Sequence, residues 1–226
     1  MTSDAVAIVV AAGTGERLGA GVPKAFVPLG GVPILVRSVE AALASPAVSS
    51  VVVPAPPGHE VTARSMLRGY AVVVVTGGKT RQDSARAGMR EIGEEVEIVV
   101  VHDAARPRAR SALFTLVAES LADAEGCVPV VAMTDTVKRV HGGWVVSTEV
   151  REELAAAQTP QAFIVGRFRE AHARAEAEGR QFTDDAAVLE WAGFKVRVVG
   201  GDRSNVKITT AEDLERGEEA LRRGEW

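Results

Sequence analysis

Runs of valine, isoleucine and alanine recur along the chain, and several are separated by longer segments with helical spacing. Uninterrupted β-branched runs are typical of strands that are covered on both faces. Residues 34–43 and 111–122 place apolar side chains three and four positions apart, which predicts helices. Strands that alternate with helices indicate an α/β fold with a doubly wound, mostly parallel sheet. The predicted strands cover residues 5–10, 51–53, 71–75, 96–101, 127–132 and 195–199.

Residues 134–150 interrupt this alternation. They contain two short apolar runs on either side of a His-Gly-Gly turn at 141–143, which is a hairpin signal. An exposed two-stranded arm that carries Trp144 and several valines needs a partner surface. We therefore predict a single domain over residues 1–226, with 134–150 as a β-arm for dimerisation. The alternative is an edge hairpin that packs on its own subunit.

The composition is that of an ordinary globular protein, with 46% hydrophobic and 25% charged residues among 226. A net charge of −4 speaks against a general nucleic-acid or anionic-membrane binder but permits a local basic pocket. No apolar run approaches the roughly 20 residues of a membrane span, and the N-terminus lacks a basic leader, so we expect a cytoplasmic protein. Cys127, the only cysteine, is interpreted as a buried strand residue, and the four histidines lack zinc-site spacing.

The candidate chemistry begins directly after the first predicted strand, in the loop of residues 11–24. In parallel sheets, ligands bind beyond the carboxyl ends of the strands. Backbone N–H groups of this glycine-rich loop can hold phosphate oxygens, and Arg17 and Lys24 can neutralise them. The P-loop pattern does not occur, and the loop's glycines are spaced one residue too widely for a dinucleotide fingerprint. The loop therefore suits a nucleoside triphosphate that is attacked at its α-phosphate.

The same loop resembles the AAGxGxRxG…PKxF signature of nucleotidyltransferases of the sugar-nucleotide type. Six further segments follow in order: GGKTRQDS at 77–84, HDAARP at 102–107, DTVK at 135–138, TPQ at 159–161, TDD at 183–185 and NVKIT at 205–209. Together they resemble the 2-C-methyl-D-erythritol 4-phosphate cytidylyltransferases of the non-mevalonate isoprenoid pathway, over essentially the whole chain. Lys79 departs from the pattern, because the family has an acidic residue there. The chain ends at Trp226, and we expect it to lack the cyclase domain that is fused to some members.

The resemblance implies a Rossmann-like nucleotidyltransferase fold and transfer of CMP from CTP to 2-C-methyl-D-erythritol 4-phosphate, with release of pyrophosphate. A phosphate oxygen of the acceptor is already ionised, so the attack on the α-phosphorus needs no strong general base. Catalysis then consists of positioning and charge neutralisation. Mg²⁺ is expected to arrive with CTP, because this ion prefers phosphate oxygens, waters and one or two carboxylates.

The resemblance also assigns roles to individual residues. Asp103 would contact the ribose or the metal ion, and the arm residues Thr136 and Arg151 would reach the acceptor across the dimer. His102 is interpreted as a buried structural histidine and Asp184 as a helix cap. The catalytic cations would be Arg17, Lys24 and Lys207. The nucleotide would be bound by Ala11, Ala12, Gly13, Gly15, Gly78, Ser84, Asp103 and Ala104, and the acceptor by Arg106, Thr136, Arg151 and Thr183.

Three other interpretations stay open. A ribitol-5-phosphate cytidylyltransferase shares many of these motifs. A nucleotidyltransferase acting on a sugar 1-phosphate is disfavoured by the separate TPQ, TDD and NVK segments. A non-catalytic nucleotide-binding module is disfavoured because Arg17, Lys24 and Lys207 occur together, and a simple binder needs no full set of transition-state cations.

Overall fold

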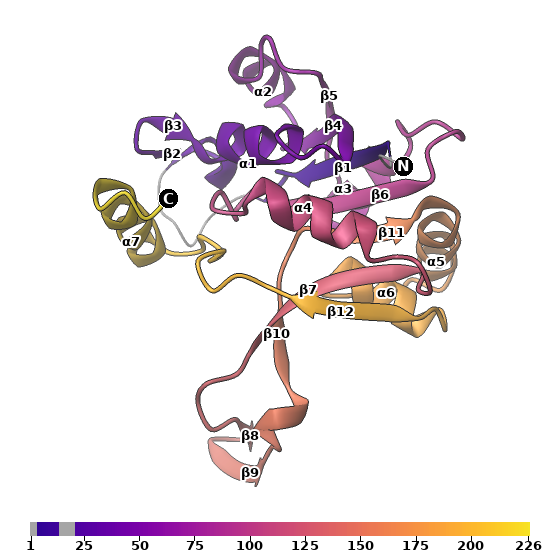
Figure 1. Ribbon diagram of the computed structural model, residues 1–226, viewed down its shortest axis with the longest axis vertical. Helices are drawn as coiled ribbons and strands as arrows, with labels where there is room; N and C mark the ends of the chain where they lie inside the picture. Colours follow the sequence, from indigo (N-terminus) through magenta and orange to yellow (C-terminus); the bar gives the residue numbers. More distant parts are fainter. Residues whose placement is uncertain (1–3, 14–20) are drawn as a thin grey trace.

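Eight strands form the central sheet of the computed structural model, which describes residues 4–13 and 21–226 (Figure 1). Their order is β10-β7-β11-β6-β1-β4-β5, and β12 also pairs with β7. The pairs β6–β1, β1–β4, β4–β5 and β7–β12 are parallel, whereas β11 runs antiparallel between β6 and β7. The mostly parallel α/β sheet is thus confirmed. The strands are β1 (Ala5–Val10), β4 (Val48–Ala55), β5 (Val72–Thr76), β6 (Ile98–Asp103), β7 (Gly126–Ala132), β10 (Ala155–Ala157), β11 (Gln161–Ile164) and β12 (Val196–Gly200).

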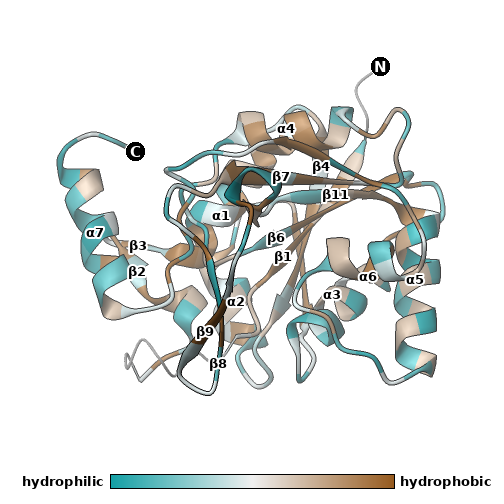
Figure 2. Ribbon diagram, turned by 90° about the horizontal axis from the view of Figure 1, so that it is seen from below, coloured by the Kyte–Doolittle hydropathy of each residue, from teal (hydrophilic) through white to brown (hydrophobic). Residues whose placement is uncertain are grey.

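Helices cover both faces of the sheet, as alternate side chains of the central strand β1 show. Ala5, Ala7 and Val9 belong to an apolar cluster with α1 (Ile34–Leu43), α2 (Glu60–Met66) and α4 (Ser111–Glu119). The intervening side chains of β1 pack with α3 (Arg81–Met89), α5 (Val165–Ala177) and α6 (Asp185–Trp191). Figure 2 shows α4 on one side of the sheet and α3, α5 and α6 on the other.

The two edge strands depart from the sequence prediction. The valine-rich runs in β5 and β12 predict strands covered on both faces. Val73 and Val198 are instead 49% and 63% exposed. An edge strand has only one neighbour, so its valine run reflects β-propensity more than burial.

The hairpin predicted at 134–150 is present and projects from the body of the molecule (Figure 1). Strands β8 (Lys138–His141) and β9 (Trp144–Thr148) pair antiparallel. Gly142 and Gly143 form the turn with φ of 55° and 84°, the left-handed backbone that such tight turns require. The Trp144 side chain at the tip is 80% exposed. The hairpin is confirmed, while its role in dimerisation stays a prediction.

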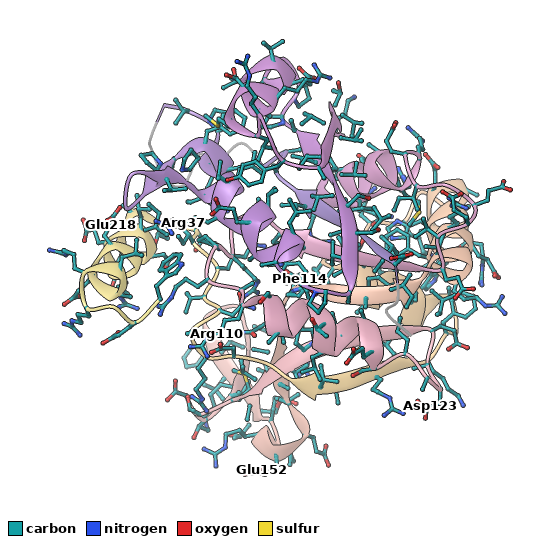
Figure 3. All side chains as sticks on the ribbon, turned by 45° about the horizontal axis from the view of Figure 1, so that its top comes forward. Arg37, Arg110, Phe114, Asp123, Glu152 and Glu218 are labelled. Atoms are coloured by element: carbon teal, nitrogen blue, oxygen red, sulfur yellow. The ribbon has the colours of Figure 1, made fainter. Side chains whose placement is uncertain are left out.

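Helix α7 (Ala211–Arg222) lies beside the small β2–β3 pair (Pro28–Leu29 and Val32–Pro33). Figure 3 shows Glu218 of this helix next to Arg37 of α1. A separate apolar cluster joins the two regions and includes Leu29 and Ile208. Ile208 directly follows Lys207, and the backbone N–H of Ile208 donates to the Ala105 carbonyl at 2.8 Å. The cluster therefore fixes the chain that presents Lys207.

A capping box holds the start of α7. Thr210 accepts a hydrogen bond from the backbone N–H of Asp213, and the Asp213 carboxylate accepts three in return from Thr209 and Thr210. These bonds, chiefly that from the Thr209 hydroxyl, lower the pKa of Asp213 to about 2. Because this pKa is depressed, the stabilisation is present above about pH 4 and is lost as pH falls towards 2.

We expect Asp213→Asn to lower the free energy of unfolding by about 1 kcal/mol at pH 7, because a charged cap is lost. Urea denaturation at several pH values measures this effect. The difference between wild type and variant should narrow between about pH 4 and pH 2. Glu212→Gln, in the same helical turn, is the matched control and should change stability little, because Glu212 forms an exposed surface pair with Arg216. A difference that stays constant down to pH 2 would contradict the prediction.

In the described part of the chain, no helix has the length and apolar character that a membrane crossing requires.

Candidate active site

The carboxyl ends of four adjacent strands, β6, β1, β4 and β5, lie along one edge of the sheet. In doubly wound sheets this edge is where ligands bind. A pocket opens there, which we call the nucleotide pocket. Its described lining consists of Val10, Ala11, Ala12, Gly13, Lys24, Ala25, Lys79, Thr80, Arg81, Ser84, Asp103, Ala104, Ala105 and Lys207.

This pocket collects most of the residues that the sequence predicted for nucleotide binding and catalysis. Gly15 and Arg17 lie outside the described residues. Gly78 adjoins the pocket, and its backbone N–H donates to Ser84 Oγ at 3.1 Å. The predicted residues that line the pocket are Ala11, Ala12, Gly13, Lys24, Ser84, Asp103, Ala104 and Lys207.

The turn between β5 and α3 is held by Ser84. Its hydroxyl donates to the Thr80 carbonyl at 2.8 Å while accepting from Gly78. A Cβ on Gly78 would lie 2.1 Å from Asp83 Cβ, so only glycine fits this approach. Thr80 caps α3 through a capping box with Asp83. Together these contacts place the start of α3, and with it Arg81, at the wall of the pocket.

Asp103, the last residue of β6, is the electrostatic centre of the pocket. Arg81 Nε lies 2.8 Å from one of its carboxylate oxygens, and Lys207 Nζ lies 2.7 Å from the other. Burial alone would raise the pKa of Asp103, but attraction by Arg81 and Lys207 outweighs it and holds that pKa well below its usual range. Asp103 is therefore ionised at every physiological pH.

Arg81 extends this network beyond the pocket. Its Nη1 lies 2.7 Å from Asp185 at the start of α6, and Asp185 lies 3.2 Å from His172 Nε2. Burial alone would lower the pKa of Arg81, but Asp185 and then Asp103 raise it. No role was assigned to Arg81 or Asp185 from sequence. The sequence signal that could have identified them is their position inside the GGKTRQDS and TDD segments.

Two residues with reactive side chains have structural positions, as predicted. His102 is fully buried, with Nδ1 3.2 Å from Thr159 Oγ1 and Nε2 3.2 Å from the Arg106 carbonyl. Burial lowers the pKa of His102 to about 4, so the ring is neutral at pH 7. Cys127 is buried in β7, and burial raises its pKa to about 11. Neither side chain is placed for acid–base or nucleophilic work.

A second, more open pocket lies at the base of the arm, and we call it the arm-base pocket. Lys207 lines it as well as the nucleotide pocket, and Arg106 also lines it. Arg106 donates to the Asn205 and Ala157 carbonyls at 2.8 and 3.4 Å. Its described lining also includes residues 131–135, Ala156, Gln158, Arg203, Asn205 and Val206.

The remaining predicted acceptor residues line neither of these two pockets. Thr136 is exposed, and Arg151 donates to the Thr134 carbonyl at 2.9 Å. Arg151 also pairs with Glu152, which Figure 3 shows on the arm, away from the body. Thr183 is exposed before α6, where Asp184 accepts from the Ala187 N–H at 3.0 Å and so caps the helix as predicted. The acceptor roles of Thr136, Arg151 and Thr183 stay predictions.

The described residues do not fit a preformed metal site. They contain no group of three or more histidine, cysteine, aspartate or glutamate side chains that could hold an ion. Asp103 is the carboxylate in the nucleotide pocket, and a cation already occupies each of its oxygens. We therefore derive no chemical step through a protein-bound metal.

Comparison with known proteins agrees with this geometry. The family model of IspD, 2-C-methyl-D-erythritol 4-phosphate cytidylyltransferase, matches residues 5–223. A bifunctional IspD/IspF enzyme of Clavibacter michiganensis is 45% identical over 96% of this chain, which spans only 54% of that relative. A 2-C-methyl-D-erythritol 4-phosphate cytidylyltransferase of Corynebacterium diphtheriae is 39% identical over 94% of this chain and 91% of the relative. The crystal structure of the enzyme from Thermus thermophilus superimposes with a TM-score of 0.82 at 32% identity, covering 96% and 99% of the two chains.

Taken with the fold and the cation-rich pocket at the carboxyl edge of the sheet, these matches define the α/β fold of the nucleotidyltransferases. The pocket is lined by small residues, among them Gly13, and by the lysines Lys24, Lys79 and Lys207, a set that suits phosphate groups. The chain belongs to the IspD family, the 2-C-methyl-D-erythritol 4-phosphate cytidylyltransferases.

Proposed function

We propose that this protein transfers CMP from CTP to 2-C-methyl-D-erythritol 4-phosphate, giving 4-diphosphocytidyl-2-C-methyl-D-erythritol and pyrophosphate. The observation that carries the proposal is the position of Lys207, which lines both the nucleotide pocket and the arm-base pocket. An in-line displacement needs the donor's α-phosphate and the acceptor's phosphate to meet at one place. Lys207, which lines both pockets, would lie where the two phosphates meet.

The chemical step is a displacement at the α-phosphorus. An ionised phosphate oxygen of the acceptor forms the new P–O bond. The bond from the α-phosphorus to the oxygen that bridges to the β-phosphate breaks, and the electron pair leaves with pyrophosphate. Lys24 and Lys207, with Arg17, neutralise the charge that accumulates on the phosphoryl oxygens. The scheme needs no general base, and His102, the histidine next to Asp103, is buried and neutral.

We assign the cytidine to the part of the nucleotide pocket that is lined by small residues. Side chains of this size let the base approach backbone donors and acceptors closely, which excludes purines by size. Mg²⁺ would arrive with CTP, held by phosphate oxygens and water rather than by a protein cage. Ala11, Ala12, Gly78 and Ser84 would read the base. The full set of nucleotide-binding residues would be Ala11, Ala12, Gly13, Gly15, Gly78, Ser84, Asp103 and Ala104.

For the acceptor we propose a site completed by a second copy of the chain. Residues 1–226 act as one domain, and the arm of one copy reaches the arm-base pocket of its neighbour. The exposed Trp144, Val145 and Val146 support this, since an apolar arm of this kind is stabilised by a partner. We place such a homodimer in the cytoplasm, with neither nucleic acid nor membrane as a partner, in keeping with the net charge of −4.

Pyrophosphate release tests the proposal. Purified protein is incubated with CTP, Mg²⁺ and either 2-C-methyl-D-erythritol 4-phosphate or D-ribitol 5-phosphate, with UTP and ATP as control donors. We expect release only with CTP and the first acceptor. Release with ribitol phosphate instead would keep the nucleotide site but change the acceptor. CTP binding without release from either acceptor would indicate a non-catalytic nucleotide-binding module.

A further inference from the structure

A continuous series of charged side chains runs from the nucleotide pocket to the contact between α3 and α6. Lys207 Nζ lies 2.7 Å from Asp103, Arg81 Nε lies 2.8 Å from the same carboxylate, and Arg81 Nη1 lies 2.7 Å from Asp185. Two cations and two anions alternate, so their charges cancel. Asp103 thus has two counter-charges, although one would neutralise it.

The two cations that hold Asp103 are anchored very differently. The Lys207 side chain is 39% exposed, contacts one carboxylate, and consists of a flexible stem with a compact ammonium group. Arg81 is 22% exposed, begins α3, and is clamped between Asp103 and Asp185, whose side chain is only 1% exposed. A planar guanidinium held at two points is a rigid partner. Lys207 is therefore the cation that can leave Asp103, and Arg81 is the cation that stays.

The proposed function requires Lys207 to leave Asp103, at least in part, for a substrate phosphate. A mostly buried carboxylate that loses every counter-charge is strongly unfavourable, so a lone Asp103–Lys207 pair would hold the lysine back. We propose that Arg81, anchored by Asp185, is a positioning residue that keeps Asp103 neutralised while Lys207 moves to the substrate phosphates. This inference rests on the proposed function of Lys207.

The alternative is that Arg81 itself binds a phosphate, since it lines the nucleotide pocket. Its Nε and Nη1 are already engaged by carboxylates. Its Nη2 is buried and has no hydrogen-bond partner within the described part of the chain. Two of the three guanidinium nitrogens are thus held by carboxylates, which favours the indirect role, and Nη2 is the atom through which a direct role would act.

A double-mutant cycle distinguishes the two roles. The kcat for pyrophosphate release is measured for wild type, Lys207→Gln, Arg81→Gln and the double variant. If Arg81 acts through Lys207, Arg81→Gln leaves the lysine held by Asp103. In the Arg81→Gln background, Lys207→Gln should then lower kcat by less than about threefold. In wild type the same replacement should lower kcat by roughly 10²-fold. If the kcat losses of the two single variants multiply in the double variant, the proposal is overturned and Arg81 has a role independent of Lys207.

Two further variants separate positioning from a merely structural effect. Arg81→Lys keeps a positive charge beside Asp103 but does not clamp both carboxylates, and we expect it to recover most of the kcat that Arg81→Gln loses. Arg86→Gln is the matched control. Arg86 lies on the same helix and pairs with Asp83 and Glu176, away from Asp103. In the Arg86→Gln background, Lys207→Gln should lower kcat by as much as it does in wild type. Failure of Arg81→Lys to recover activity would contradict the proposal.

Circular dichroism and thermal unfolding check that each variant folds. If Arg81→Gln does not fold, the cycle is repeated with Asp185→Asn. This variant removes the carboxylate that anchors Arg81 at nearly constant side-chain size, and it should show a smaller coupling with Lys207→Gln of the same sign. Losses in kcat that simply multiply in this second cycle would overturn the proposal. Failure of the proposed function itself is seen in wild type, as no pyrophosphate release. The same cycle measured on the Kd for CTP by isothermal titration would then decide whether Lys207 exchanges between Asp103 and the triphosphate.

Discussion

Replacing Lys207 by glutamine is expected to lower kcat for cytidylyl transfer by roughly 10² to 10³. Glutamine keeps most of the length of the side chain but removes the charge. Lys207 lines both pockets, so the variant loses the cation that the proposed function places where the α-phosphate of CTP meets the acceptor phosphate. The loss corresponds to about 3–4 kcal/mol of transition-state stabilisation. Steady-state pyrophosphate release at saturating CTP and acceptor measures it.

The matched control for this variant is Lys195→Gln. Lys195 is exposed beside the edge strand β12 and lies outside both described pockets. Its replacement should leave kcat within about twofold of wild type. A similar loss in both variants would show that lysine replacement acts through general destabilisation. A Lys207→Gln enzyme with normal kcat and a raised KM for CTP would place the lysine in ground-state binding only.

Arg151→Ala is expected to raise the KM for the acceptor far more than the KM for CTP. A guanidinium binds two phosphate oxygens at once, and a charged hydrogen-bond pair of this kind contributes about 1.5–3 kcal/mol. The acceptor KM should therefore rise by roughly 10- to 100-fold, while that for CTP changes by less than about threefold. Arg139→Ala is the control, because Arg139 is an arm arginine paired with Glu149. Equal effects on both substrates would refute the assignment of the arm to the acceptor.

Mixing two defective variants tests whether Arg151 acts across a dimer. In a dimer of one Arg151→Ala chain and one Lys207→Gln chain, one site has Lys207 from the first chain and Arg151 from the second. At acceptor concentrations well below the wild-type KM, where both parent variants are defective, random exchange of subunits should restore about a quarter of wild-type activity if each site uses the neighbour's arm. No recovery on mixing chains that exchange would place Arg151 at its own subunit's site.

The strands at the six valine-rich runs and the hairpin were predicted correctly because each depends on local sequence. Valine runs prefer extended backbone wherever they occur, and the turn at Gly142 and Gly143 needs positive φ that glycine adopts without strain. The cap at Asp184 is a local signal of the same kind, since it binds an N–H only three residues ahead. Strand β11 was missed. It has only four residues, and its place between β6 and β7 is a property of the whole sheet.

The sequence by itself determined the α/β class, the arm and the lysines Lys24 and Lys207 that line the nucleotide pocket. Only the tertiary structure decided how those charges are held. Asp103 and Lys207 are separated by 104 positions, and so are Arg81 and Asp185. Periodicity and motif spacing report neighbours within a few residues, whereas these pairs form because β6, α3, α6 and the segment before α7 converge at one edge of the sheet. Because these distant elements converge, they exclude water from Asp103. A buried carboxylate without a counter-charge is strongly unfavourable, so Arg81 is needed as a second cation beside Lys207.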